Sequence, residues 1–237
     1  MNKAKSHILS IDSLEEMLSV LRHELGNPIN SLKITLDVLR ENYDLFDDVK
    51  KRGYLNRASE LLSKQEKLID ALKSYSKFHV REQTKIAFIP FWESFSAMAS
   101  NRLRDGNIRL TRNLETEPCS VKANSPALNE IMLSILDNAI EAVENVNKPT
   151  IELKASRANG FVKIQMKDNG PGIKADDMSK IFIPLFSTKS GKMGMGLAIA
   201  RKLSWEMGGR MEVESSLGIG TEARLWLKTL GDEENEI

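Results

Sequence analysis

Mostly apolar residues in the first third of the chain recur at alternating steps of four and three positions. The first series is Leu14, Leu18, Leu21, Leu25, Pro28, Leu32, Thr35 and Leu39. The second series is Ala58, Leu61, Gln65, Leu68, Leu72 and Tyr75. This spacing predicts two long bundle helices, the first reaching about Asp44, with a turn around Asp47 to Gly53. Two such helices cannot bury both stripes against each other alone, so we expect a homodimer in which two hairpins form a four-helix bundle.

Beyond about Thr84 the pattern changes to short runs in which apolar and polar residues alternate, as in half-buried strands. These runs cover residues 108–111, 150–154, 161–166, 210–215 and 221–227. Helical patterns separate them at 91–104, 125–146 and 196–207. Helices interleaved with a mixed sheet predict a two-layer α/β sandwich. We therefore expect an α+β protein with a helical hairpin over 1–81, a sandwich domain over 82–230 and an acidic tail over 231–237.

Composition narrows the class of protein. The chain has 34 Lys and Arg against 33 Asp and Glu, so overall charge gives no case for nucleic acid or an anionic membrane as the main partner. The single cysteine, Cys119, excludes an intrachain disulfide and a cysteine zinc cluster. No apolar run approaches the length of a membrane span, and no secretory signal follows the basic N-terminus. We expect a cytoplasmic location.

One histidine of the first predicted helix stands apart from the apolar seam. With Leu21 at a d position, His23 falls at f and faces away from the partner helices. Glu24 is close enough in sequence to orient the imidazole or accept its proton, and Asn27 follows one turn later. These are the requirements for nucleophilic catalysis by histidine. An ordinary solvated helix surface is the alternative interpretation of the same residues.

Three elements of the second domain suggest a nucleotide site. Asp168 to Gly172 ends a strand with a carboxylate and two glycines, where something flat can approach the backbone. Gly191 to Leu197 opens a helix with glycines whose N–H groups favour anions. Asp137 to Ala142 places Asn138 inside an amphipathic helix, and its amide oxygen suits Mg²⁺. Alone, the first element also fits a plain turn, and a glycine pair before a helix is weak evidence.

Taken together, these motifs resemble those of the bacterial sensor histidine kinases of two-component systems. His23 to Pro28 resembles the family's H box, Leu136 to Ala139 its N box, Asp168 to Gly172 its G1 box, Ile181 to Phe186 its F box, and Gly194 to Leu197 its G2 box. Gly218 to Thr221 resembles the closing element of the gyrase-type ATP-binding fold. The resemblance covers about residues 10–228.

The resemblance implies an ATP site with Mg²⁺ in the second domain. The residues implied to hold the base are Asp168, Gly170, Gly172 and Thr221. Those implied to hold or neutralise the phosphates are Lys189, Lys192, Gly194, Gly196 and Leu197. Asn138 is the implied magnesium ligand, and residues from about 174 to 193 would form a mobile lid over the nucleotide.

For the hairpin, the resemblance implies that His23 attacks the γ-phosphoryl group of ATP while Glu24 fixes its tautomer and takes the proton. The phosphoryl group would then pass to an aspartate of a response regulator. Asn27 completes a His-Glu-x-x-Asn pattern that is similar to that of kinases which also dephosphorylate their regulator. We therefore expect a kinase that is also a phosphatase.

Two features depart from the family pattern. Ser134 stands where many members have a second asparagine one turn before Asn138, so weaker magnesium binding is one possibility. Only about ten residues precede the first predicted helix, which fits either a fragment or a kinase that receives its signal from a separate sensor protein. The competing functions are a phosphotransfer adaptor with an inactive ATP domain, and a gyrase-type ATPase or a related serine kinase.

Overall fold

The computed structural model describes residues 11–117, 119–189 and 192–230. Contacts divide it into two compact units. One contains the helical hairpin up to Lys77, with which Ile183–Met195 is grouped, and the other contains Phe78–Phe182 and the chain from Gly196 onward. The acidic tail expected over 231–237 lies outside the described residues, and the expected boundary between residues 81 and 82 stays a prediction.

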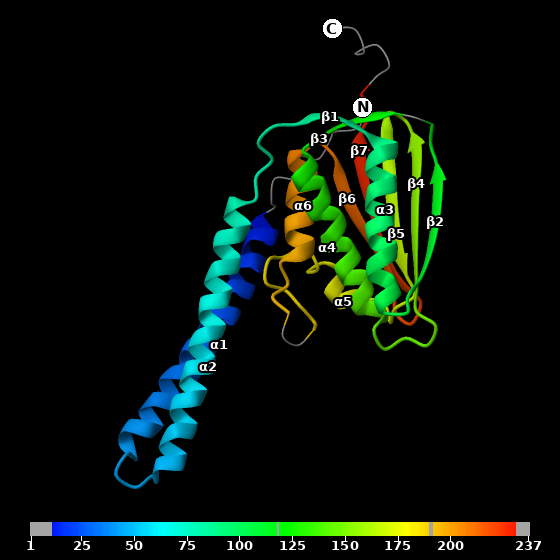
Figure 1. Cartoon of the computed structure of the whole chain (residues 1–237). Helices are drawn as coiled ribbons and strands as arrows, with labels where there is room; N and C mark the ends of the chain where they lie inside the picture. Colours follow the sequence, from blue (N-terminus) through cyan, green and yellow to red (C-terminus); the bar gives the residue numbers. More distant parts are fainter. Residues whose placement is uncertain (1–10, 118, 190–191, 231–237) are drawn as a thin grey trace. The chain divides into compact units, whose positions relative to one another are not determined.

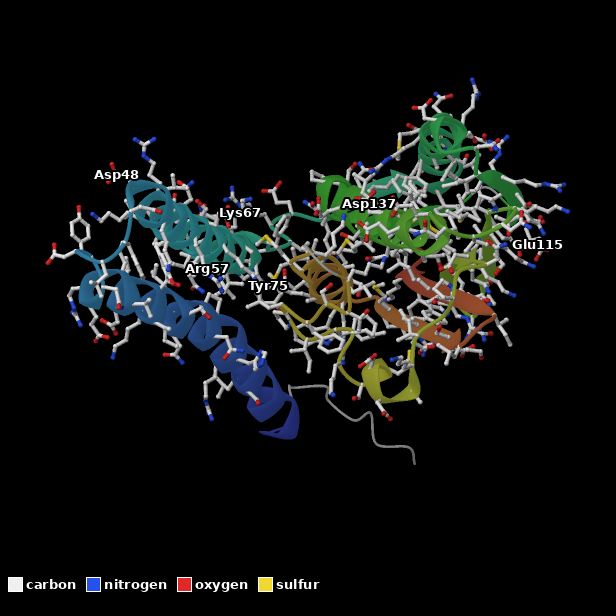
Figure 2. All side chains as sticks on the ribbon, turned by 90° about the horizontal axis from the view of Figure 1, so that it is seen from below. Asp48, Arg57, Lys67, Tyr75, Glu115 and Asp137 are labelled. Atoms are coloured by element: carbon white, nitrogen blue, oxygen red, sulfur yellow. The ribbon has the colours of Figure 1, made fainter. Side chains whose placement is uncertain are left out.

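The hairpin consists of α1 (Ile11–Glu41) and α2 (Asp48–Lys77). The predicted turn is wrong at its second end, because α2 already begins five residues before Gly53. The side chain of Asp47 accepts the backbone N–H of Lys50 at 2.8 Å, which satisfies a free donor of the first helical turn. Side chains extend along all of α2, from Asp48 near its start to Tyr75 near its end (Figure 2).

The predicted seam of the hairpin is confirmed for most of its described side chains, but Leu18 on α1 is 48% exposed. Pro28 is buried, as are the seam residues Thr35, Leu39, Ala58, Gln65 and Leu68. A second set of apolar side chains is exposed at seven-residue intervals: Ile29 and Leu36 on α1, and Leu55, Leu62 and Ile69 on α2. A heptad spacing of exposed apolar residues indicates a further bundle face, which a single hairpin leaves open.

The second domain follows in the order β1 (Thr84–Ala87), α3 (Phe88–Asp105), β2 (Arg109–Glu115), β3 (Ser120–Ala123), α4 (Ser125–Val143), β4 (Thr150–Ala158), β5 (Phe161–Asp168), α5 (Ala175–Met178), α6 (Gly196–Glu206), β6 (Arg210–Ser216) and β7 (Gly220–Lys228). Five strands form one sheet in the order β2-β4-β5-β7-β6. The β2–β4 pair is parallel and the other pairs are antiparallel, which confirms the mixed sheet. Helices α3, α4 and α6 cover one face of it (Figure 1).

Alternation along the strands places the core between this sheet and the three helices. In β5, Val162, Ile164 and Met166 are buried while the residues between them are at least partly exposed. Helix α4 supplies the opposite side of the core, with Leu128 and Ile131 fully buried. The side chains that face away from the helices are mostly polar, with Phe161 and Trp226 among the exceptions, so the sheet carries a solvated face.

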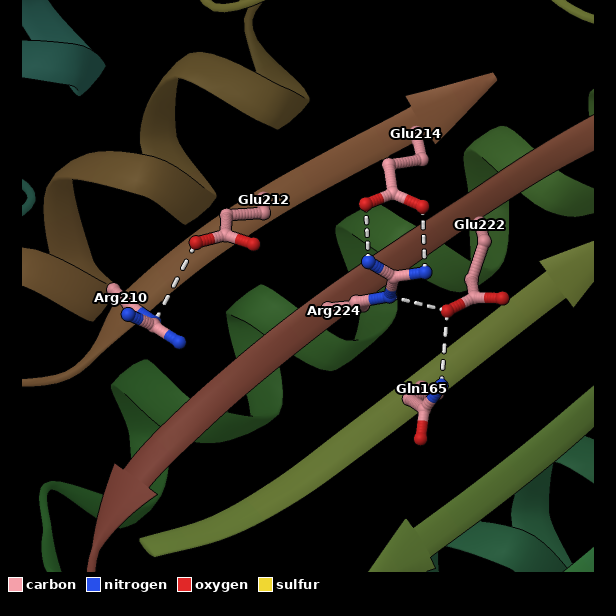
Figure 3. A network of polar contacts seen from close by, with 6 residues as sticks. All are labelled: Gln165, Arg210, Glu212, Glu214, Glu222 and Arg224. Carbon is pink, nitrogen blue, oxygen red and sulfur yellow. Dashed lines mark hydrogen bonds and ion pairs between the residues drawn. The ribbon is translucent and has the colours of Figure 1, made fainter. Parts of the chain in front are cut away.

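An ion-pair network lies on that solvated face (Figure 3). The guanidinium of Arg224 on β7 binds the carboxylates of Glu214 and Glu222, and Gln165 donates to Glu222 at 2.9 Å. Partial burial acts to raise the pKa of Glu222, but the hydrogen bonds from Gln165 and Arg224 outweigh it and lower that pKa below its usual value. The two carboxylates raise the pKa of Arg224.

Three short elements had no counterpart in the prediction. Strands β1 and β3 have four residues each and pair with one another as a separate two-stranded sheet, and α5 is a single turn. Among the described helices, none is both long and apolar enough to cross a membrane.

Candidate functional site

The histidine proposed to receive phosphate lies on the outer surface of α1. His23 is exposed, and its Nε2 lies 2.9 Å from the side-chain amide nitrogen of Asn27, one helical turn later. Because an amide nitrogen donates, this contact suits the tautomer in which Nε2 keeps its lone pair and Nδ1 carries the proton. The side chain of Glu24 lies outside the described part of the structure, so its pairing with His23 stays a prediction.

In the second domain, a buried carboxylate ends the central strand β5. Asp168 is 5% exposed, and its Oδ1 accepts the backbone N–H groups of Gly170 at 2.8 Å and Thr221 at 3.3 Å. Asp168 and Thr221 are also register partners in the β5–β7 pair. The structure thus joins two segments that are 53 residues apart in the chain. A buried acceptor held by two backbone donors keeps a fixed orientation.

The loop after Asp168 packs so closely that residues 170 and 172 leave no room for a side chain. A Cβ at Gly170 would lie 2.9 Å from the Cβ of Ala142 on α4. Gly172 has a φ of +71°, and a Cβ there would overlap the carbonyl of Ser216. The amide of Gly218 donates to the carbonyl of Pro171 at 2.7 Å and fixes the loop to the β6–β7 turn. Glycine is therefore required for both conformation and space at residue 172.

One face of α4 connects this corner with the start of α6. Ser134, Asn138 and Ala142 are spaced by four residues and therefore lie along the same face of the helix. Ala142 meets Gly170 at one end. At the other end, a methyl group on Gly196, the first residue of α6, would lie 3.7 Å from Oγ of Ser134 and 3.8 Å from Nδ2 of Asn138. The two helical turns from 134 to 142 span about 12 Å.

The remaining predicted phosphate-binding residues belong to the segment Ile183–Met195. Gly194 has a φ of +63°, and its carbonyl accepts the N–H of Leu185 at 3.1 Å, which closes the base of the segment. Lys189 and Lys192 are exposed. This segment is grouped with the hairpin unit, whereas Gly196 and Leu197 begin α6 in the other. The structure therefore brings Asp168, Gly170, Gly172 and Thr221 together, and Asn138 with Gly196, but does not place the two lysines relative to them.

Sequence reasoning missed two residues that hold the site together. Ser215 on β6 accepts the N–H of Ile173 and donates to the carbonyl of Gly220, both at 2.9 Å. Asn169 accepts the N–H of Thr150 at 2.8 Å and donates to the carbonyl of Lys148 at 3.0 Å. Ser215 had no local signal, while Asn169 lay inside the motif and was counted only as part of its turn.

Family models match both parts of the chain. The His Kinase A (phospho-acceptor) domain matches residues 13–79, and the histidine kinase-, DNA gyrase B- and HSP90-like ATPase matches residues 123–230. The fold and the two sites thus define a class in which a phospho-acceptor hairpin is joined to a gyrase-type ATPase domain. The chain belongs to the histidine kinases of two-component systems.

Individual relatives agree with this family. The C4-dicarboxylate transport sensor protein DctB of Pseudomonas aeruginosa is 30% identical over 220 residues, which are 92% of this chain and 36% of DctB. The sensor protein FixL of Bradyrhizobium diazoefficiens is 25% identical over 226 residues, 93% of this chain and 45% of FixL. The chain therefore spans between a third and a half of these curated relatives.

Solved structures show the same fold. The catalytic domain of histidine kinase ThkA is 25% identical, with a TM-score of 0.56, over 62% of this chain and 96% of that one. ThkA in complex with response regulator protein TrrA is similar over 95% of this chain and 64% of that one, with a TM-score of 0.63 and 24% identity.

Proposed function

We propose that this protein is an ATP-dependent histidine kinase that phosphorylates its own His23 and passes the phosphoryl group to an aspartate of a response regulator. The observation that carries the proposal is the α4 face from Ser134 to Ala142, with a buried carboxylate at one end and a glycine-opened helix at the other. Its span of about 12 Å suits a nucleotide bound lengthwise, with the base near Asp168 and the phosphates near Gly196.

The residues present fit ATP and Mg²⁺. Oδ1 of Asp168 is already held by two backbone donors, so the carboxylate is oriented to accept a hydrogen bond from the adenine amino group. Gly196 and the N–H of Leu197 begin a helix whose dipole favours phosphate. No cluster of three or more acidic, His or Cys side chains that could hold a metal occurs among the residues that the structure describes. Mg²⁺ would take Asn138 as its protein ligand and complete its shell with phosphate oxygens and water, neutralising charge on the triphosphate.

His23 supplies the nucleophile. A bond forms from Nε2 to the γ-phosphorus while the bond to the bridging oxygen of ADP breaks, and the ring then loses its Nδ1 proton, for which Glu24 is the proposed acceptor. Asn27 must release Nε2 before this attack, because its amide occupies the same lone pair. We propose that the same amide orients water against the phosphorylated regulator, which makes the protein a phosphatase as well.

The partners follow from the same proposal. The exposed heptad-spaced residues of α1 and α2 support a homodimer through the hairpin. The ThkA structure that is similar over most of this chain is a complex with a response regulator, which supports a regulator as the acceptor for this family member too.

Measurements of nucleotide binding and of labelling distinguish the proposed kinase from the adaptor alternative. The protein should bind ATP with Mg²⁺ and take up label from γ-labelled ATP. A dimer that binds no nucleotide and takes up no label would support the adaptor. A label that appears on serine would instead favour the serine kinases.

The role of Asn27 is tested separately from that of His23. Asn27→Ala should keep autophosphorylation within about threefold but slow dephosphorylation of the regulator by about tenfold or more, since one positioned polar group contributes on that order. Asn30→Ala, also exposed on α1, is the matched control. Equal loss of both activities in Asn27→Ala would reject the separate role.

A further inference from the structure

Most hydrogen bonds between the second domain and the segment that joins α2 to β1 go to one residue, and the side chain of Asn124 adds one more by donating to the carbonyl of Glu82 at 2.8 Å. Glu206, the last residue of α6, accepts the backbone N–H of Val80 through Oε2 at 2.7 Å. Its Oε1 lies 3.2 Å from Nδ1 of His79. Its backbone carbonyl accepts the side chain of Gln83 at 3.3 Å. Three residues of this linker, defined here as Phe78–Gln83, thus converge on a single position of α6.

The environment of Glu206 makes these contacts strong for a surface loop. Its side chain is 20% exposed, and Lys202, one turn earlier, lies 3.9 Å from Oε1. A hydrogen bond from a backbone amide to an ionised carboxylate is stronger than one between neutral groups. The linker and the end of α6, including Trp205, line an open hollow of about 640 Å³, so the carboxylate meets His79 and Val80 beside open space and not within a packed core.

The position of Val80, which Glu206 holds, determines how many linker residues after α2 are free to move. Helix α2 ends at Lys77 and β1 begins at Thr84. While Val80 is held, three steps along the chain separate it from Lys77, a reach of about 10 Å. When Glu206 releases it, five steps separate Lys77 from Glu82, whose carbonyl stays bound by Asn124, a reach of about 17 Å. This linker is the covalent connection between the helix hairpin that carries His23 and the domain that holds the ATP site.

We propose that Glu206 is a positioning residue that restrains the ATP-binding domain by shortening the linker, and that its release lets the bound nucleotide reach His23 more often. The inference rests on the proposed kinase function. Because Glu206 and Gly196 lie at opposite ends of α6, about 15 Å apart, the restraint acts on domain movement and leaves the nucleotide site itself unchanged.

The test uses the full chain and two independent readouts. Hydrogen exchange of the Val80 amide reports the fastening, and steady-state autophosphorylation separates kcat from the KM for ATP. Glu206→Ala should speed exchange at Val80 by about tenfold and raise kcat by about threefold or more, with an unchanged KM, since a longer tether changes the effective concentration of the two sites.

Two further variants complete the design. Glu206→Gln keeps an oxygen that can accept the Val80 N–H, so it should stay within about twofold of the wild-type kcat. Glu212→Ala removes a carboxylate paired with Arg210 on β6, away from the linker, and should change neither readout.

The outcomes separate the two proposals. An unchanged or lowered kcat in Glu206→Ala, with Val80 exchanging fast, would overturn the restraining role. A raised KM would place Glu206 in nucleotide binding and overturn it too. Fast exchange of Val80 in the wild type would mean that no restraint exists. A further outcome is that the wild type takes up no phosphate while the Val80 amide is protected in the wild type and exchanges fast in Glu206→Ala. In that case the kinase proposal fails, but the contact between Glu206 and the linker is upheld.

Discussion

The helical hairpin and the ATP-binding domain differ in how they bury their apolar side chains. The second domain encloses its own core, with side chains such as Leu128, Ile131 and Leu225 fully buried. The hairpin buries one seam but leaves Leu55 and Leu62 on α2 more than half exposed, at heptad spacing. A hairpin of this kind is completed by another helix pair, whereas the sandwich is complete within one chain.

The two regions also differ in how they present their functional side chains. The ATP-binding domain holds its polar group rigidly, since Asp168 is buried and fixed by backbone donors. The hairpin instead presents His23 on an exposed helix face, where Nε2 contacts the side chain of its helix neighbour Asn27. A preorganised pocket suits selection of a nucleotide, and an exposed nucleophile suits access by the two proposed partners, ATP and then a regulator.

The largest expected effect of a single substitution lies in the pocket. Asp168→Asn replaces an acceptor with a group that presents N–H to the backbone donors or to adenine, so ATP affinity should fall by about 100-fold or more. Calorimetric titration with ATP and Mg²⁺ measures it, and light scattering should find the hairpin-mediated dimer unchanged. Asp176→Asn, exposed on α5, serves as the control. Equal ATP affinity in Asp168→Asn would remove Asp168 from base recognition.

A charge placed on the exposed apolar face of the hairpin should weaken the proposed dimer. Leu62→Asp would bury one unpaired carboxylate per protomer in the proposed bundle, and a cost of at least ~1.4 kcal/mol per copy raises the dimer dissociation constant by about 100-fold. Analytical ultracentrifugation measures it, while ATP affinity should stay the same. Ser63→Asp adds the same charge at the neighbouring exposed residue and should leave the dimer intact. Dissociation by both variants would argue against a specific face.

Two glycines with similar backbone angles should differ in their tolerance of a methyl group. Gly218 has a φ of +80° and open space around it, so Gly218→Ala should cost only the conformational penalty of about 1–2 kcal/mol. Gly172→Ala adds an overlap with the carbonyl of Ser216 and should cost a further ~1–3 kcal/mol. Chemical unfolding of the two variants measures the difference. Equal losses would mean that the loop and the β6–β7 turn do not need their close approach.

The smallest effect concerns pH and the outer face of the sheet. The pKa of Glu222 lies below its usual value of 4.5 in the folded protein, so its stabilising effect is present above that pH and is lost as the pH falls through the lowered pKa. Arg224→Ala should therefore flatten the decline of the melting temperature below about pH 4.5, by less than ~1 kcal/mol in stability. Thermal melts from pH 7 to 3.5 test this, with Lys228→Ala, exposed on the same strand, as control. An identical acid decline in Arg224→Ala would show that the network does not set it.

Local patterns predicted much of this molecule because the relevant information was local. The seam of the hairpin follows from residue spacing, and Leu39, Ala58 and Leu68 are buried accordingly. The contacts of Asp168 with Gly170 arise within one motif of five residues. The β4–β5 turn is equally local, since Asn159 and Gly160 both have the positive φ that is typical of a tight hairpin.

Features that depend on distant partners could not be predicted. Strand β1 has no apolar alternation of its own and exists through pairing with β3, more than 30 residues further on. The hydroxyl of Ser215 reaches the glycine loop only because β6 lies beside β7. The end of α6 gave no signal either, since the value of Glu206 depends on where the linker passes.

The proposed kinase needs the two regions to act together, and mapping of phosphohistidine tests this most directly. Wild-type protein, His23→Ala and Asp168→Asn are incubated with γ-labelled ATP and Mg²⁺, and acid-labile, alkali-stable label is located by mass spectrometry. We predict label on residue 23 of the wild type and none in either variant, although His23→Ala still binds ATP and Asp168→Asn still dimerises. Label that persists in His23→Ala, or a wild-type dimer that binds ATP and takes up no label, would contradict the proposed function.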